Sequence, residues 1–223
     1  MRSRKAWRVA TAALALALYA LLWAGFAQQW HWLTVIDGFA LHRSHQYGVA
    51  HPGWVTFWNV FCWILGPGAF RLVALVVIVI ALSRRNLRVA LFLVISVELS
   101  GVVGESAKAV ANRPRPVVSL VSAPTTSFPS GHALGVMVAV LALLTVVLPI
   151  AHPRLRVWLI AIGAIIVVAI GVGRVVLCVH YVSDVLAGWA LGYVWYVVCT
   201  LMVPQAVPIT AADETPAVPG NSR

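Results

Sequence analysis

Charge is scarce in this sequence, and negative charge is the scarcest. Of 223 residues only 10% are charged, with six Asp and Glu against sixteen Lys and Arg, whereas 61% are hydrophobic. Water-soluble domains carry about 25% charged residues, so the composition excludes that class. Cysteine is also rare: Cys62, Cys178 and Cys199 form no CxxC pair and lie in apolar sequence. We therefore expect small core residues and no disulfide.

Long apolar runs take the place of charge. A helix needs about 20 apolar residues to cross a bilayer, and short polar breaks separate several such runs here. The predicted fold is therefore all-α, a polytopic membrane bundle with about six transmembrane helices in a single domain, residues 1–203. The expected spans are 9–27, 67–83, 89–111, 133–150, 157–172 and 185–203.

The remaining segments are less regular. Residues 28–53 are rich in Trp and His, which suits the headgroup level of a membrane, and we expect one or two amphipathic interfacial helices there. Residues 204–223 contain several prolines and no apolar period, which predicts a disordered cytoplasmic tail. The first apolar run is long for a signal peptide and lacks a clear cleavage site, so an uncleaved anchor is favoured.

The basic residues gather at the ends of the apolar runs, which is an orientation signal and argues against a nucleic-acid partner. With the N-terminus in the cytoplasm, three basic clusters lie inside, as the positive-inside rule prefers. These clusters are Arg2, Arg4, Lys5 and Arg8; Arg84, Arg85 and Arg88; and Arg154 and Arg156. The same topology brings the loops 112–130 and 174–184 together on the outer side. Short loops without a glycosylation sequon on that side suit a bacterial inner membrane.

The stretch FPSGHALGV, residues 128–136, opens the fourth span with polar and permissive residues. A helix N-terminus has unpaired N–H groups and the positive end of the macrodipole, so Ser130 as N-cap with Gly131 makes a small anion-binding cradle. Three cations, Lys108, Arg115 and Arg174, are expected around the same point. Together they match the charge and oxygen count of a phosphoryl group.

Two histidines supply reactive groups at this cradle. His180 and Asp184 lie one helical turn apart, so the carboxylate can accept the proton on one imidazole nitrogen and leave the other free as a nucleophile. His132, in the first turn of the fourth span, can then donate a proton to the leaving oxygen. The pattern predicts phosphoryl transfer by two histidines, with fixed cations in the place usually taken by a metal.

The three segments together resemble the signature of the type 2 phosphatidic acid phosphatase superfamily, which includes bacterial lipid phosphatases and the vanadium haloperoxidases. The resemblance spans about residues 66–203. Its matching residues are Lys108, Arg115 and Pro116; Pro129, Ser130, Gly131 and His132; and Arg174, His180 and Asp184.

The resemblance implies a role for each matching side chain. His180 would form a phosphohistidine, Asp184 would orient it, and His132 would be the acid for the leaving group. The phosphate would be held, without a metal or another cofactor, by Lys108, Arg115, Ser130, Gly131 and Arg174. The serine that the family usually has before the third-segment arginine is Gly173 here. This change removes one hydroxyl contact to the phosphate.

The resemblance implies a lipid phosphatase whose site faces the extracytoplasmic side of the cell membrane. Undecaprenyl pyrophosphate is the first expected substrate, followed by phosphatidylglycerophosphate and phosphatidic acid. The alternatives left open are phosphoryl transfer to a lipid or sugar acceptor, a lipid transporter and an inactive scaffold. A zinc hydrolase using His132, His180 and Asp184 is disfavoured, because three converging cations would repel Zn²⁺.

Four other charged residues carry weaker signals. Glu105 precedes Lys108 by one helical turn, so we expect an ion pair between them, and Glu98 lies on the same helix face at mid-span depth. Asp37 lies among the four histidines of the first outer loop, but these lack the tight spacing of metal ligands, and we expect a wet interfacial helix. Arg113 can contact substrate or face solvent.

Overall fold

The computed structural model describes the backbone of residues 2–203 and the side chains from residue 5 onward. These residues form nine α-helices and one short π-helical segment, with no strand among them, which confirms the all-α prediction. The helices are α1 (Arg2–Ala27), α2 (His31–Ala50), α3 (Pro52–Ile64), α4 (Pro67–Ser83), α5 (Leu87–Leu93), η1 (Val94–Glu98), α6 (Ser100–Ala111), α7 (Gly131–Val147), α8 (Pro153–Val176) and α9 (Val182–Met202). The predicted tail, 204–223, lies outside the described residues.

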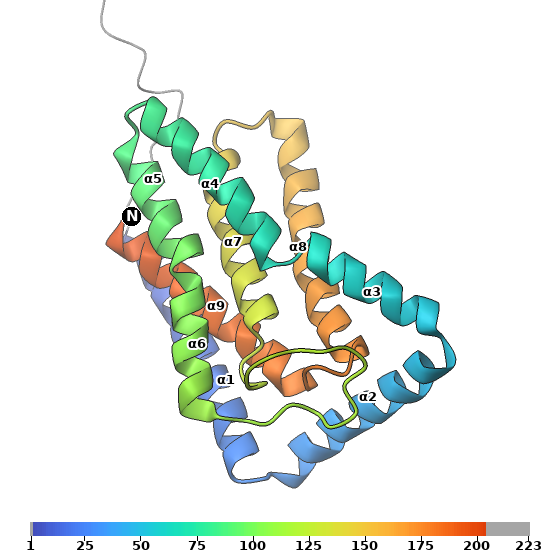
Figure 1. The fold of residues 1–223 in the computed structure, drawn as a ribbon. Helices are drawn as coiled ribbons and strands as arrows, with labels where there is room; N and C mark the ends of the chain where they lie inside the picture. Colours follow the sequence, from blue (N-terminus) through green and yellow to red (C-terminus); the bar gives the residue numbers. More distant parts are fainter. Residues whose placement is uncertain (1, 204–223) are drawn as a thin grey trace, which may run out of the picture.

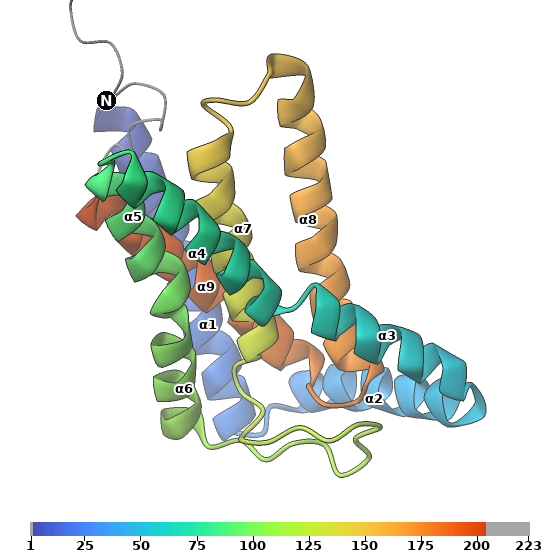
Figure 2. The same ribbon diagram turned by 45° about the horizontal axis from the view of Figure 1, so that its top comes forward.

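The helices form a bundle around α7, which packs against α9, α8, α4 and α6 (Figure 1). α1 packs along α9, and α2 runs across one end of the bundle, as Figure 2 shows. The same end carries the 112–130 loop, and we call it the loop end. Because α6 and α8 end there while α7 and α9 begin there, the three signature segments meet at the loop end.

The expected spans agree with the helices. Five helical stretches are long and apolar enough to cross a membrane, and α7, with 17 residues, is a shorter sixth. The long stretches are Lys5–Ala27, Pro52–Ser83, Leu87–Ala111, Pro153–Val176 and Val182–Met202. The chain is thus a multi-pass membrane protein.

The predicted start of the second span is a helix boundary, because α4 begins at Pro67. The apolar stretch that contains α4 begins earlier, at Pro52, because α3 is itself apolar and precedes α4 closely. Pro67 cannot donate a backbone hydrogen bond, so it divides the stretch into two helices and occupies the first turn of α4. The junction lies beside the start of α7, where it contributes to the site described below.

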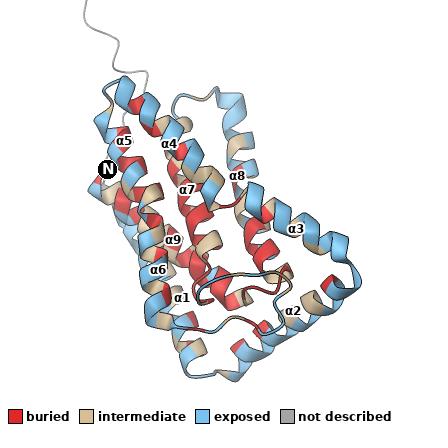
Figure 3. Ribbon diagram, in the orientation of Figure 1, coloured by how far each residue is buried: buried red, intermediate tan, exposed pale blue. Residues whose placement is uncertain are grey.

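Buried residues concentrate on the central helices α7 and α9, whereas the outward faces of α1, α3, α4 and α8 are exposed (Figure 3). Many of the exposed side chains on these faces are large and apolar, such as Leu72, Val76 and Trp158. A lipid-facing surface has this composition. The three cysteines are buried and free, as expected.

Glycines allow α7 and α9 to pack closely. A Cβ atom at Gly188 of α9 would lie 2.6 Å from the carbonyl oxygen of Ser130, and one at Gly192 would lie 2.9 Å from that of Leu134. Small residues at a transmembrane helix interface bring the two backbones together. The close contact holds the start of α9, which carries Asp184, beside the start of α7, which carries His132.

Candidate active site

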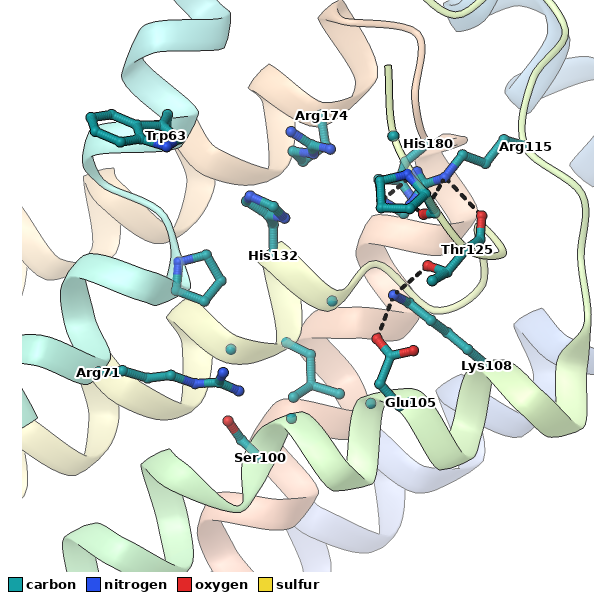
Figure 4. A pocket seen from close by; sticks show the side chains of 18 of the residues that line it. Trp63, Arg71, Ser100, Glu105, Lys108, Arg115, Thr125, His132, Arg174 and His180 are labelled. Carbon is teal, nitrogen blue, oxygen red and sulfur yellow. Dashed lines mark hydrogen bonds and ion pairs between the residues drawn. The ribbon is translucent and has the colours of Figure 1, made fainter. Parts of the chain in front are cut away.

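A cavity of about 440 Å³ opens at the loop end between α3, α4, α6, α7, α8 and the 112–130 loop. Six of the eight predicted site residues line it: Lys108, Arg115, Gly131, His132, Arg174 and His180 (Figure 4). The other two, Ser130 and Asp184, are fully buried directly behind it. The structure therefore brings together all eight residues, although they come from three separate segments of the chain.

Ser130 caps α7 as predicted. Its Oγ accepts a 3.4 Å hydrogen bond from the backbone N–H of Ala133, and its own N–H donates a 2.9 Å hydrogen bond to the carbonyl of Asp184. The next residue, Gly131, lies against Lys108, whose Nζ is 3.4 Å from the position of a Cβ at Gly131. The helix N-terminus and the ammonium group thus face the same space, as an anion-binding cradle requires.

Lys108 is held in place by two oxygen atoms. Its Nζ donates hydrogen bonds to Oε1 of Glu105 at 2.9 Å and to Oγ1 of Thr125 at 3.2 Å. The first contact confirms the predicted ion pair. Thr125 was not predicted, because its position depends on how the proline-rich loop folds back over α6.

His180 lies between Asp184 and Arg115. Its Nδ1 is 3.4 Å from Oδ2 of Asp184, which is longer than a well-formed hydrogen bond, and that carboxylate oxygen also accepts the N–H of Tyr181 at 2.9 Å. Nη1 of Arg115 lies 3.2 Å from Nε2 of His180. A guanidinium can only donate, so this contact requires an unprotonated Nε2 and leaves the proton of the neutral ring on Nδ1, facing Asp184.

The surroundings of His180 favour the neutral imidazole. Burial lowers the pKa of His180 from 6.5 to about 4, and the nearby Arg174 and Arg115 contribute in the same direction, although Asp184 opposes them. The side chain is therefore uncharged near neutral pH, with an unprotonated Nε2 that accepts the contact from Arg115. This is the state that a nucleophilic histidine needs.

Arg115 joins the loop to the nucleophile. It donates hydrogen bonds to the carbonyls of Val179 at 2.7 Å, Pro124 at 2.9 Å and Thr125 at 3.0 Å, besides its contact with His180. Burial lowers the pKa of Arg115, but a guanidinium remains charged at any physiological pH. A phosphate bound at Nε2 of His180 would therefore also meet this cation.

Arg174 and His132 occupy the opposite side of the cavity from the loop. Arg174 is 7% exposed at the end of α8, and its Nε has no hydrogen-bond partner among the described residues. His132 lies beside the α3–α4 junction, where a Cβ at Gly66 would be 3.5 Å from its ring. Figure 4 shows both side chains pointing into the cavity that His180 also lines.

The structure gives a steric reason for Gly173. A Cβ at this position would lie 2.6 Å from Sγ of Cys62 and 2.7 Å from the ring of Trp58, both on α3. A serine would therefore collide with α3, so the close packing of α3 on α8 depends on glycine.

A buried ionic network behind the cavity was not predicted. Arg113 is 7% exposed and donates hydrogen bonds to Oδ1 of Asp184 at 2.6 Å, Oδ2 of Asp37 at 2.9 Å and Oγ of Ser183 at 2.7 Å. Its guanidinium also lies 4.0 Å from the ring centroid of Tyr181. Neither expectation for Arg113 was right, because this side chain contacts the carboxylate behind the nucleophile and not the cavity or solvent.

The expectation of a wet environment is also wrong for Asp37. This residue is 2% exposed, and its carboxylate accepts hydrogen bonds from Arg113 and from both the N–H and the hydroxyl of Ser183. The sequence did contain a signal for a buried role, because Asp37 is the only acidic residue before Glu98. Among the residues with described positions, no three His, Cys, Asp or Glu side chains are grouped to hold a metal ion.

Known proteins resemble this chain in sequence and in fold. An undecaprenyl-diphosphatase from Sulfolobus acidocaldarius is 32% identical over 138 residues, which cover 59% of this chain and 63% of that protein. The match thus spans less than two thirds of the relative. A crystal structure of a transmembrane PAP2-type phosphatidylglycerolphosphate phosphatase from Bacillus subtilis superposes with a TM-score of 0.69 at 22% identity, covering 86% of this chain and 95% of that one.

The family assignment rests on a broader match. The model of the PAP2 superfamily matches residues 89–208, which include all three signature segments and more than half of the chain. On this evidence the chain belongs to the PAP2 superfamily.

Proposed function

We propose that the chain is a metal-independent lipid phosphatase that acts through a phosphohistidine. The observation that carries the proposal is the position of His180, whose Nε2 is unprotonated at a cavity lined by Lys108, Arg115 and Arg174 while Nδ1 faces Asp184. Such a cavity favours a phosphate, and an unprotonated imidazole nitrogen can attack it.

In the first step, Nε2 of His180 attacks the phosphorus atom of the terminal phosphate and forms a P–N bond. The P–O bond to the lipid breaks, and His132 gives its proton to the departing oxygen. Asp184 stabilises the charge that the imidazole ring acquires. The three cations and the N-terminus of α7 neutralise the equatorial oxygens of the phosphoryl group.

In the second step, the oxygen of a water molecule attacks the phosphorus atom, and the now neutral His132 accepts a proton from that water molecule. The P–N bond breaks, inorganic phosphate leaves, and both histidines return to their starting states. An alcohol in place of water would yield a new phosphate ester, which is the transferase alternative.

We propose lipid phosphates as substrates, with undecaprenyl diphosphate and phosphatidylglycerophosphate as the first candidates. The relatives named for these two activities support the choice. The lipid-facing surface around the loop end suits a substrate that stays in the membrane. The positive-inside pattern supports an extracytoplasmic site at this end of the bundle.

The decisive experiment measures phosphate release by the purified protein from both candidate lipids and from phosphatidic acid, with excess EDTA. We expect chelator-resistant release that His180→Ala abolishes. His31→Ala is the matched control, since His31 is an exposed histidine on α2 and should retain wild-type activity. Release that survives in His180→Ala would reject the proposal.

A second measurement tests the intermediate and the alternatives. Substrate labelled in its terminal phosphate should transfer the label to the protein, and alkaline quenching should preserve it, because phosphohistidine is labile in acid. No label should be retained by His180→Ala. A candidate acceptor alcohol added to the assay separates hydrolysis from transfer, because transfer yields a labelled ester and not free phosphate.

A further inference from the structure

One charged residue in the cavity has no role in the mechanism above. Arg71 lies on α4 and lines the same cavity as His132 and His180. Among the described side chains it forms no hydrogen bond or ion pair, and its Nε is buried without a partner. Figure 4 shows it on the far side of His132 from His180, pointing into the cavity.

Helix geometry places Arg71 deeper in the bundle than the phosphate cradle. Pro67, at the start of α4, packs against Gly135 in the second turn of α7. Arg71 follows Pro67 by four residues, about 6 Å of rise away from the loop end. The side chain of Arg71 contacts Gly101 on α6. Gly101 precedes Lys108 by seven residues, which is about 10 Å of helical rise.

Gly101 makes room for the guanidinium. A Cβ atom at this position would overlap Nη2 of Arg71. Any other residue at 101 would therefore push the arginine out of its present position. The guanidinium of Arg71 thus occupies space beside α6 that is open only because residue 101 has no side chain.

An unpaired arginine within a membrane span is costly, and functional use usually explains it. The two acids of the neighbouring span do not neutralise it. Glu105 pairs with Lys108, and Glu98 forms no ion pair with any described residue. Among the described residues, Arg71 therefore has no anionic partner.

Resting on the proposed function, we infer that Arg71 binds a second phosphate, carried by the leaving group of the substrate. His132 protonates the oxygen that joins the transferred phosphate to the leaving group, and Arg71 lies beyond His132. A guanidinium binds a phosphate through paired hydrogen bonds. The preferred substrates are therefore lipids with two phosphates, and a lipid with a single phosphate would leave Arg71 unpaired.

Two kinds of lipid carry a second phosphate. In a prenyl diphosphate it is joined to the first through one oxygen, and in phosphatidylglycerophosphate three glycerol carbons separate the two. The rise of about 10 Å between Lys108 and Gly101 favours the longer spacing. The following experiment separates the two sources.

The test compares kcat/KM of wild type and Arg71→Gln on phosphatidylglycerophosphate, a prenyl diphosphate and phosphatidic acid. Loss of one charged hydrogen-bonding contact should lower kcat/KM on a two-phosphate lipid about 10- to 100-fold. On phosphatidic acid the change should stay within about threefold, which also shows that the variant is folded. The two-phosphate lipid whose kcat/KM falls more in Arg71→Gln has the spacing between phosphates that the site prefers.

Two further variants sharpen the result. Gly101→Ala should displace the guanidinium and reproduce the selective loss without removing the charge. Arg84→Gln removes an exposed arginine at the opposite end of α4 and should change none of the three activities. An equal loss on all three lipids in Arg71→Gln, or no loss on any, would overturn the inference.

A binding measurement distinguishes failure of this inference from failure of the proposed function. Propane-1,3-diyl bisphosphate and propyl phosphate should be compared by their effect on the thermal unfolding midpoint of the purified protein. Wild type should bind the bisphosphate more tightly, and Arg71→Gln should bind both alike. If wild type shows this preference but no phosphatase activity, the second-phosphate site stands and the proposed function fails. If wild type shows phosphatase activity but no preference for the bisphosphate, the proposed function stands and the second-phosphate site fails.

Discussion

The two sides of His180 differ in how their charges are balanced. On the cavity side, Arg71 and Arg174 each keep a buried Nε without a hydrogen-bond partner. On the opposite side, Arg113 is enclosed and paired with Asp37 and Asp184. Unpaired cations beside a membrane indicate where an anion binds, whereas a fully paired arginine indicates a fixed support. In the proposed mechanism, Arg71 and Arg174 would therefore bind substrate, whereas Arg113 would position the carboxylate of Asp184.

The largest effect on stability is expected from removing the ion pairs of Arg113 with Asp37 and Asp184. Arg113→Gln leaves Asp37 and Asp184 buried without their cation, which should lower the free energy of unfolding by about 3–5 kcal/mol. Thermal unfolding in detergent would measure the loss. Asp37→Asn in the same chain removes the excess negative charge and should recover part of the stability. An unchanged unfolding midpoint in Arg113→Gln would contradict the assignment of a supporting role.

A second variant should show the opposite behaviour on the cavity side. Arg174→Gln removes a cation that faces the developing charge, so we expect kcat to fall about 100- to 1,000-fold. The unfolding midpoint should not fall, because no ion pair is lost. Phosphate release and thermal unfolding should be measured on the same preparation. Loss of both activity and stability would remove the distinction between the two sides.

A smaller effect tests the packing next to Arg174. Gly173→Ser introduces the serine that is usual in the family, and its collision with Cys62 and Trp58 should cost about 1–3 kcal/mol of stability. Gly68→Ser is the control, because nothing lies within 4 Å of a Cβ at that glycine. If Gly173→Ser is as stable as the control, α3 adjusts more easily than the contacts imply.

The smallest expected change is in the pH dependence. His180 must be neutral to attack, and its pKa is lowered to about 4, so kcat/KM should persist as the pH falls from neutral and should be lost only near pH 4. Arg115→Gln removes one of the cations that lower this pKa and should move the acid limb upward. An acid limb of the wild type at pH 6.5 would mean that the pKa of His180 is unshifted.

Local spacing made much of the site predictable. Ser130 and Gly131 follow from helix capping. The four-residue spacing of His180 and Asp184 indicated that the two side chains face each other, although His180 lies before Tyr181, the N-cap of α9, and not on the helix as predicted. The apolar runs gave the six spans because the length of a membrane helix is fixed by the bilayer. Each of these inferences needs only residues that are close in the sequence.

The missed features all depend on contacts between distant segments. Asp37 and Arg113 are 76 residues apart, and nothing local indicates that they pair. The steric need for glycine at position 173 depends on the packing of α3 against α8. The proposed role of Arg71 depends on its position in the cavity lining. Sequence spacing predicted which residues meet at the cavity, whereas tertiary packing determines which residues hold them there.

The hydrogen bond from the N–H of Ser130 to the carbonyl of Asp184 joins the first residues of two helices. It couples the cradle for the phosphate to the residue behind the nucleophile through the backbone alone, so no side-chain rotation can separate them. The relative placement of these groups is therefore fixed when the chain folds and is not rebuilt at each turnover. In the proposed mechanism, a cradle and a carboxylate that are fixed in this way need little reorganisation before the phosphate reacts.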